Sequence, residues 1–151
     1  MSKSRATSML SKYSQTAIDS GVESATPHRL VQMMMEGVLD KVALAKGFMA
    51  RREYEAEGRH IKWAVSLING LRMSLNKDDG GELAEDLDAL YDYMVRQLLE
   101  AQVNSKSELL DEVTSLMREV KSGWDAIPDV LDSEAGAVQP GKYADAAPLG
   151  L

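Results

Sequence analysis

The chain has 151 residues, 44% of them hydrophobic, which suits a single domain with one core of ordinary size. It contains no cysteine, which excludes a disulfide framework, a thiolate metal site and a thiol nucleophile, and which is compatible with a cytoplasmic location. A net charge of -7 argues against a nucleic-acid partner, and no apolar run comes near the ~20 residues that span a bilayer, so we expect no membrane insertion.

Residues 1–25 are predicted to form an N-terminal arm. They are polar and rich in serine, and they lack the continuous apolar stretch of a secretory signal. Leu10, Tyr13 and Ala17 nevertheless keep the spacing of one helical face. The arm is therefore expected to form a short amphipathic helix or to lie across the rest of the protein, with a frayed terminus as the alternative.

The first long helix is expected to run from Thr26, a good N-cap followed by Pro27, to about Arg52. Its predicted core row consists of Leu30, Met33 or Met34, Gly37, Leu44 and Phe48. A second apolar flank consists of Val31, Met35, Leu39, Val42 and Met49. A helix that is apolar over so much of its circumference is either central or carries a surface for a partner. Since residues 33–35 point in three successive directions, at least one of these methionines must face away from the core.

A second helix is expected from about Tyr54 to Asn76. Its apolar stripe is continuous and consists of Ile61, Ala64, Val65, Ile68, Leu71 and Leu75. The paired glycines at 80 and 81 then predict a turn over residues 77–81, because glycine readily adopts the positive φ that other residues avoid.

The stretch from Gly81 to Gln102 is interpreted as the helix around which the others pack. Its main apolar row consists of Leu83, Leu87, Leu90, Met94, Leu98 and Ala101, and a second row consists of Tyr91, Val95 and Leu99. Two adjoining rows can bury against two neighbours, which predicts a bundle. The carboxylates of Asp86, Asp88 and Asp92 are expected on the solvated side of this helix.

A serine at position 105 or 107 is expected to cap the last helix. The apolar face of this helix consists of Leu109, Val113, Leu116, Val120, Trp124 and Ile127. From Pro128 onward the sequence has no period, which predicts a disordered C-terminal tail over residues 128–151. Four helices with short connections predict an all-α fold, an antiparallel four-helix bundle over residues 26–127.

Two patterns point to possible chemistry. Glu57 and His60 form one Glu-x-x-His, but a di-iron bundle needs two such pairs and two further carboxylates, so a solvated helix surface is favoured and no metal or other cofactor is expected. His60 is also a candidate phosphotransfer histidine. Such domains place a lysine three residues after the histidine and a small residue next, whereas here Lys62 comes two residues after His60 and Trp63 follows it. This slip of one residue is a rotation of about 100° on a helix. No cysteine nucleophile, glycine-rich phosphate loop or serine elbow is present, so no enzyme is expected.

The order of several short motifs resembles that of the flagellar export chaperones that hold flagellin, the FliS family. The resemblance spans about residues 13–127 and is carried by Tyr13, Ala25-Thr26-Pro27 with Leu30, Met34-Met35-Glu36-Gly37, Ile68 with Leu71, Ser74 and Leu75, Leu90-Tyr91-Asp92-Tyr93-Met94, Leu98 with Glu100-Ala101, and Trp124. The family usually has Leu-Tyr-Asp-Gly where this chain has Met34-Met35-Glu36-Gly37, so any role of the tyrosine hydroxyl in the family does not carry over to Met35.

The resemblance implies an export chaperone that binds the disordered C-terminal segment of flagellin in the cytoplasm, prevents premature polymerisation and supports delivery to the flagellar type III export apparatus. The export gate and a weak homodimer are further expected partners. The predicted flagellin-binding groove consists of Ile61, Val65, Ile68, Leu71, Leu75, Met35 and Tyr91. The arm, through Leu10, Tyr13 and Ala17, is expected to cover part of this groove in the absence of cargo. A histidine phosphotransfer module and a self-associating helical adaptor are the alternatives.

Overall fold

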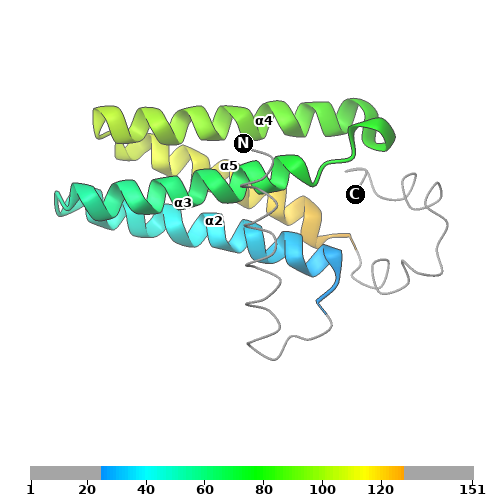
Figure 1. The fold of residues 1–151 in the computed structure, drawn as a ribbon, viewed down its shortest axis with the longest axis horizontal. Helices are drawn as coiled ribbons and strands as arrows, with labels where there is room; N and C mark the ends of the chain where they lie inside the picture. Colours follow the sequence, from blue (N-terminus) through cyan, green and yellow to red (C-terminus); the bar gives the residue numbers. More distant parts are fainter. Residues whose placement is uncertain (1–24, 128–151) are drawn as a thin grey trace.

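A computed structural model describes residues 25–127, so the predictions for the tail and for almost all of the arm lie outside the described residues. The described part of the chain forms four helices and no strand: α2 (Pro27–Ala50), α3 (Tyr54–Met73), α4 (Lys77–Asn104) and α5 (Ser107–Asp125) (Figure 1). The predicted all-α four-helix fold is confirmed. None of these helices is long and apolar enough to cross a membrane.

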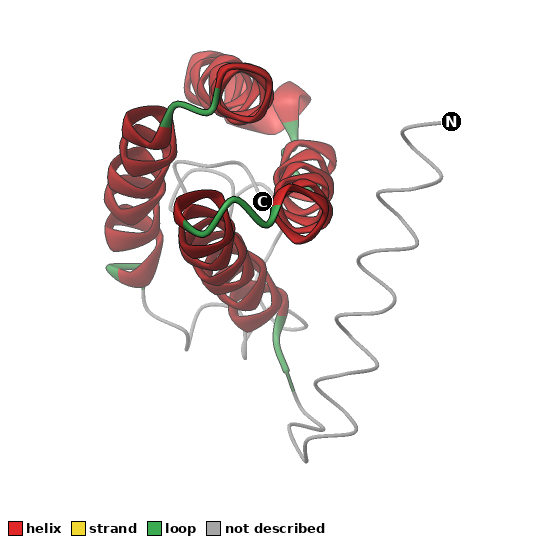
Figure 2. Ribbon diagram, turned by 90° about the vertical axis from the view of Figure 1, so that its left-hand side faces the viewer, coloured by secondary structure: helices red, strands yellow, loops and turns green. Residues whose placement is uncertain are grey.

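The four helices surround a common interior (Figure 2). Each packs against two neighbours in the order α2, α3, α4, α5, and α5 returns to α2. The connections are only a few residues long, which makes successive helices antiparallel. The prediction that the Gly81–Gln102 helix is central is wrong, since α4 occupies one position in this ring and the most extensive contact lies between α2 and α3.

Helix α2 buries a different row from the one predicted. The buried apolar residues are Val31, Met34, Met35, Val38, Val42, Ala45 and Met49. Of the predicted core row, apart from Met34, Leu30, Met33, Gly37 and Phe48 are half-buried and Leu44 is 41% exposed. The reason is Lys41, which interrupts the predicted row, whereas Val38 and Ala45 continue the other row without a charge. One of the three consecutive methionines, Met33, does face away from the core, as expected.

The other helices show smaller shifts of the same kind. In α5 the buried residues are Leu110, Val113, Met117 and Trp124, while the predicted Leu109 and Leu116 are only partly buried. In α4, Leu83 and Leu99 are exposed although both were expected in apolar rows. Residues three and four apart share a helical face, so a neighbouring row fits a sequence pattern almost as well as the buried one.

Helix ends follow the chemistry of their caps. Thr26 accepts a hydrogen bond from the backbone N–H of Arg29 (3.0 Å), as predicted for this N-cap. Residues 77–80 of the predicted turn are helical and begin α4, and Gly81, with a φ of 55°, then kinks the helix, so only the break at the glycine was predicted correctly. The predicted serine cap of the last helix is wrong: Ser105 ends α4 in the left-handed conformation, and Lys106 is the N-cap of α5 without a side-chain bond.

The first turn of α2 and the last turn of α5 are joined by a reciprocal contact. His28 Nε2 lies 3.0 Å from the carbonyl oxygen of Trp124, and Trp124 Nε1–H donates to the carbonyl oxygen of His28 at the same distance. The two rings stack with centroids 4.8 Å apart, and both residues are buried. This contact closes the ring of helices across 96 residues of sequence.

Gly70 of α3 lies against the end of the Met34 side chain of α2. A Cβ atom at this position would lie 2.5 Å from Cε of the fully buried Met34, so the glycine leaves room for that side chain. At Gly123 in α5, by contrast, a Cβ atom would meet nothing within 4 Å.

The same substitution should therefore have different effects at these two helical glycines. Alanine in place of glycine favours a helix by up to about 1 kcal/mol, so Gly123→Ala should raise the free energy of unfolding. Gly70→Ala should raise it less or lower it, because the end of the buried Met34 side chain must shift to make room for the new methyl group. Urea unfolding of both variants measures the difference, and a Gly70→Ala protein as stable as Gly123→Ala would show that Met34 moves aside freely.

Candidate binding surface

The predicted groove is mostly core in this structure. Ile61, Ile68 and Leu71 of α3 are at most 1% exposed, and Met35 and Tyr91 lie in the same core. Burial also raises the pKa of the Tyr91 phenol. The predicted stripe of α3 is continuous, but most of it packs against the other helices of the bundle. A ligand therefore cannot reach these five side chains.

The remaining two groove residues, Val65 and Leu75, are half-buried. Val65 lies two helical turns before Arg72, so it is on the side of α3 from which Arg72 bonds to α4. Leu75 lies in the connection between α3 and α4. Leu75 lines an open cleft between these helices together with Asn69, Arg72, Met73, Lys77, Asp88 and Val95. On α4, Leu99 lies one turn beyond Val95 and is 44% exposed. Val65, Leu75, Val95 and Leu99, here called the α3–α4 surface, thus provide accessible apolar groups beside the predicted stripe.

A network of ion pairs lies at one end of the α3–α4 surface. It includes Asp88 and Asp92, which were expected on the solvated side of their helix. Arg72 Nε donates to Asp88 at 2.9 Å and its Nη1 donates to Asp92 at 3.3 Å. Lys77 also contacts Asp88, and Arg96 contacts Asp92. The hydrogen bond from Arg72 is the main cause that holds the pKa of Asp88 below its ordinary value. These carboxylates join α3 to α4 and set the register of the two helices.

A second accessible surface lies along the boundary of α2 and α3. Lys41 Nζ sits 4.0 Å from the centre of the Trp63 ring, and the rings of Phe48 and His60 are 4.9 Å apart. Trp63 is 44% exposed, so a large aromatic side chain remains available to solvent. With Leu44, these residues form what we call the α2–α3 surface. This surface includes Leu44 and Phe48, the last two residues of the α2 row that was predicted to be core.

Glu57 and His60 do not form a metal site. Glu57 is 1% exposed, and its Oε1 has no hydrogen-bond partner among the described residues. His60 lies on the α2 side, where its Nδ1 is 2.7 Å from the carbonyl oxygen of Ala56. Within residues 25–127, no three potential metal ligands come together. The expectation of a solvated surface is wrong for Glu57, whose burial raises its pKa.

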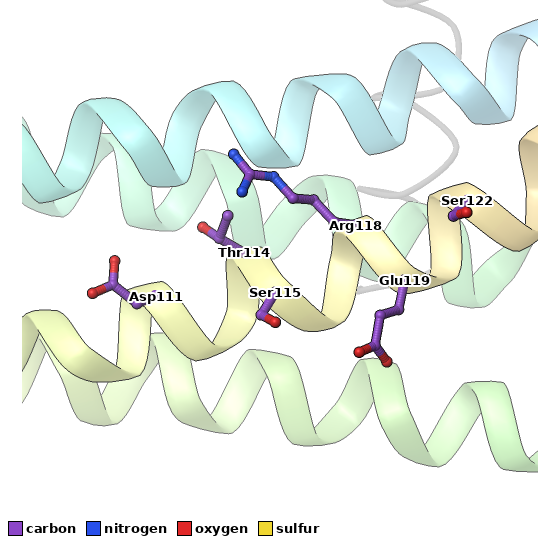
Figure 3. Close-up of a pocket in the computed structure, with 6 residues that line it drawn as sticks. All are labelled: Asp111, Thr114, Ser115, Arg118, Glu119 and Ser122. Carbon is purple, nitrogen blue, oxygen red and sulfur yellow. The ribbon is translucent and has the colours of Figure 1, made fainter.

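The outer face of α5 carries a shallow polar depression without a catalytic arrangement. It is lined by Asp111, Thr114, Ser115, Arg118, Glu119 and Ser122, which all come from this one helix (Figure 3). Arg118 extends toward α2 while Glu119 extends toward α4, so these two charged groups diverge. A nucleophile and its base must lie within hydrogen-bonding distance, and no such pair is found among these six residues.

Comparison with known proteins identifies close similarities over most of the chain. The family model described as "Flagellar protein FliS" matches residues 9–130. The flagellar secretion chaperone FliSB of Pseudomonas aeruginosa is 46% identical over 118 residues, which cover 78% of this chain and 94% of that protein. The flagellar secretion chaperones FliS of Vibrio cholerae and Salmonella typhimurium are 37% and 34% identical, over 79% and 76% of this chain and 88% and 86% of those proteins.

The buried carboxyl of Glu57 should give the protein a specific pH dependence. Burial raises the pKa of Glu57 above the ordinary 4.5. Between these two pKa values the folded protein keeps a proton that the unfolded chain releases. The free energy of unfolding therefore increases as pH falls through the folded pKa toward 4.5. Glu57→Gln should therefore be more stable than the parent at pH 7, with a difference that shrinks as pH approaches 4.5. Denaturant unfolding at several pH values measures it, with Glu55→Gln on the same turn as the exposed control. A constant difference across this range would contradict the assignment.

Proposed function

The chain belongs to the FliS family of flagellar proteins, and we propose that it is a secretion chaperone that binds the C-terminal segment of flagellin. On this proposal it acts in the cytoplasm, keeps flagellin from polymerising early and supports delivery to the flagellar type III export apparatus, with the export gate as a further partner. The named relatives are chaperones and not enzymes. A phosphotransfer role is also disfavoured by the packing of His60 against Phe48, because such a histidine must stand free for its partner.

The observation that carries this proposal is the apolar surface that remains after the core is complete. On the α2–α3 surface, Leu44 and Trp63 are each more than two-fifths exposed. On the α3–α4 surface, Leu99 is equally open. Exposed apolar groups that border one helix on both sides are typical of a protein that holds another chain.

Helix α3 lies between these two surfaces and is the centre of the proposed cargo site. Trp63 extends from α3 toward α2. Val65, two turns before Arg72, lies on the side of α3 toward α4. A segment that is disordered when free can wrap both sides by laying apolar faces into the boundaries between helices. While the apolar side chains of this cargo segment are buried against Trp63 and Leu99, they cannot contact other flagellin molecules, so polymerisation is prevented.

This proposal assigns different roles to the residues of the predicted groove. Val65 and Leu75 contact cargo directly, because they are partly accessible. Ile61, Ile68 and Leu71 hold α3 in position from inside the core, together with Met35 and Tyr91. The sequence pattern therefore indicates the helix of the binding site, while the contacts come from its flanks.

Exposed positions permit a test that does not unfold the bundle. Leu99→Asp and Trp63→Asp should each weaken binding of flagellin at least tenfold, since a charged group would then be buried against apolar cargo. Leu83→Asp is the matched control: it makes the same change at a similarly exposed leucine of α4, on the side toward α5. Co-purification and calorimetry with flagellin, and with flagellin that lacks its C-terminal segment, provide the measurement.

Normal binding by both folded variants would refute the α3-centred site. Equal binding of flagellin with and without its C-terminal segment would refute the choice of cargo segment. Size-exclusion chromatography of the protein with and without flagellin tests the alternative of a self-associating adaptor, for which the protein would form oligomers and leave flagellin unbound.

The N-terminal arm is proposed to compete with cargo through Leu10, Tyr13 and Ala17. A helix as short as this face is marginal alone and needs apolar surface to lie on. Occupation of the cargo site by the arm lowers apparent affinity by the fraction of molecules in which the site is open. Tyr13→Ala in the full chain should therefore strengthen flagellin binding severalfold in calorimetry, with Ser14→Ala as the control. Weaker binding by Tyr13→Ala would mean that the arm helps to hold the cargo.

A further inference from the structure

We propose that the boundary between α4 and α5 is a second docking surface, which takes a basic amphipathic helix of a partner protein. This surface lies on the side of α4 away from α3, so it is separate from the cargo site proposed above. The inference rests on an open apolar hollow, on a continuous apolar row and on the sign of the surrounding charge.

The hollow lies where α4 begins and α5 ends. It is lined by Leu83, Leu87, Glu119, Val120, Gly123, Trp124 and Ile127. Leu83 is 38% exposed, and the absence of a side chain at Gly123 leaves open space. Its volume of about 280 Å³ is just below the ~300–1,000 Å³ of small-molecule sites. One or two apolar side chains of a peptide suit it better than a cofactor does.

The apolar row continues from this hollow along the two helices. Leu90 on α4 and Leu109 and Leu116 on α5 are partly buried against the core and keep an accessible edge. Farther along, Tyr93 and Gln97 of α4 both donate to Glu112 of α5, at 2.8 and 3.1 Å. From Leu83 to Gln97 the surface is ~21 Å long at 1.5 Å per residue, which matches about four turns of a bound helix.

Among the described residues, the charged groups that border this apolar row are acidic, apart from Arg96 at its far end, whose guanidinium lies 5.9 Å from the centre of the Tyr93 ring. Asp86 lies two helical turns before Tyr93 and so on the same side of α4. Glu119 extends toward α4, whereas Arg118, the next residue, extends toward α2 (Figure 3). On the other side of Tyr93, Arg96 bonds to Asp92, which belongs to the α3 side. An apolar stripe bordered by Asp86, Glu112 and Glu119 is complementary to an apolar helix face bordered by lysine or arginine.

Segments of this chain fit the surface less well. Residues 128–151 contain four acidic residues and one lysine, so the tail would be repelled. The arm does contain Lys3, Arg5 and Lys12. Its apolar positions from Leu10 to Val22 would span ~18 Å as a helix, but Asp19 and Glu23 offset two of these three positive charges. A more strongly basic helix from another protein is therefore the assigned occupant.

The probe for the test is a synthetic 18-residue amphipathic peptide of leucine and lysine, with a leucine and glutamate peptide of the same pattern as its counterpart. In calorimetry with the full chain at low salt, the lysine peptide should bind with one-to-one stoichiometry and the glutamate peptide should not. The double variant Asp86→Lys/Glu119→Lys should weaken binding at least tenfold. The control Glu55→Lys/Asp111→Lys changes the net charge equally but away from this boundary, and it should change binding less than threefold.

Two neutral variants separate docking from general charge attraction. Gly123→Leu fills the hollow without altering charge. It should weaken binding of the lysine peptide at least fivefold and should keep the melting transition of the protein. The arm variant Leu10→Ser/Tyr13→Ser should leave the affinity unchanged. Flagellin binding by Gly123→Leu should also be unchanged, so that failure here is distinguishable from failure of the cargo site.

Three results would overturn the proposal. The first is absence of one-to-one binding of the lysine peptide by the parent protein. The second is an equal loss in the two charge-reversed variants, which would mean that only net charge attracts the probe. The third is a tenfold gain in affinity in the arm variant, which would mean that the arm of this chain is the resident of the surface.

Discussion

The bundle depends on the contact of His28 with Trp124. Four helices joined by short connections form a chain of neighbouring pairs, and only the return of α5 to α2 turns this chain into a closed ring. The two reciprocal hydrogen bonds satisfy polar groups that would otherwise be buried without partners, and the stacked rings fill the space between the helix ends. Removal of either ring would leave a cavity and an unpaired group at one end of the core. On the surface beside this contact, Gln32 donates to Asp125, and Lys121 bridges Glu36 and Asp125.

Closure of the ring determines which apolar rows face inward, and this is where prediction from sequence reached its limit. The helices, the N-cap at Thr26 and the glycine turn at Gly81 follow from local rules, and the sequence predicted them. Local rules do not determine which of the two apolar rows of α2 is buried, because both rows have a helical period. Only the packing of α2 against the other helices, which buries Met34, Val38 and Ala45, shows which row is inside. A lysine within an apolar row, such as Lys41, is the signal that should have favoured the other row.

The same limit applies to the candidate binding surface. An uninterrupted apolar stripe such as that of Ile61, Ile68 and Leu71 has no polar residues because it is buried in the core. Periodicity alone therefore selects residues that a ligand cannot reach. Accessible contacts lie at the edges of the stripe, where Trp63 and Val65 point to either side. The roles of Glu57 and His28 were also invisible in the sequence. Their burial results from contacts between segments far apart in the chain, and neither residue has a local pattern that reports it.

Helix α4 separates two surfaces that differ in charge. On its α3 side, Arg72, Lys77 and Arg96 balance Asp88 and Asp92, so the apolar groups near Leu99 lie beside a neutralised network. On its α5 side, neither Asp86 nor Glu119 forms an ion pair within the described residues. A segment suited to the second surface carries excess positive charge, and its cations would be repelled by Arg72 and Lys77 at the first. Leu83 and Leu99 lie on opposite flanks of α4, so occupation of one surface does not block the other. If both proposals hold, the chain can hold its cargo and a basic partner at the same time, and charge determines which segment binds to which side.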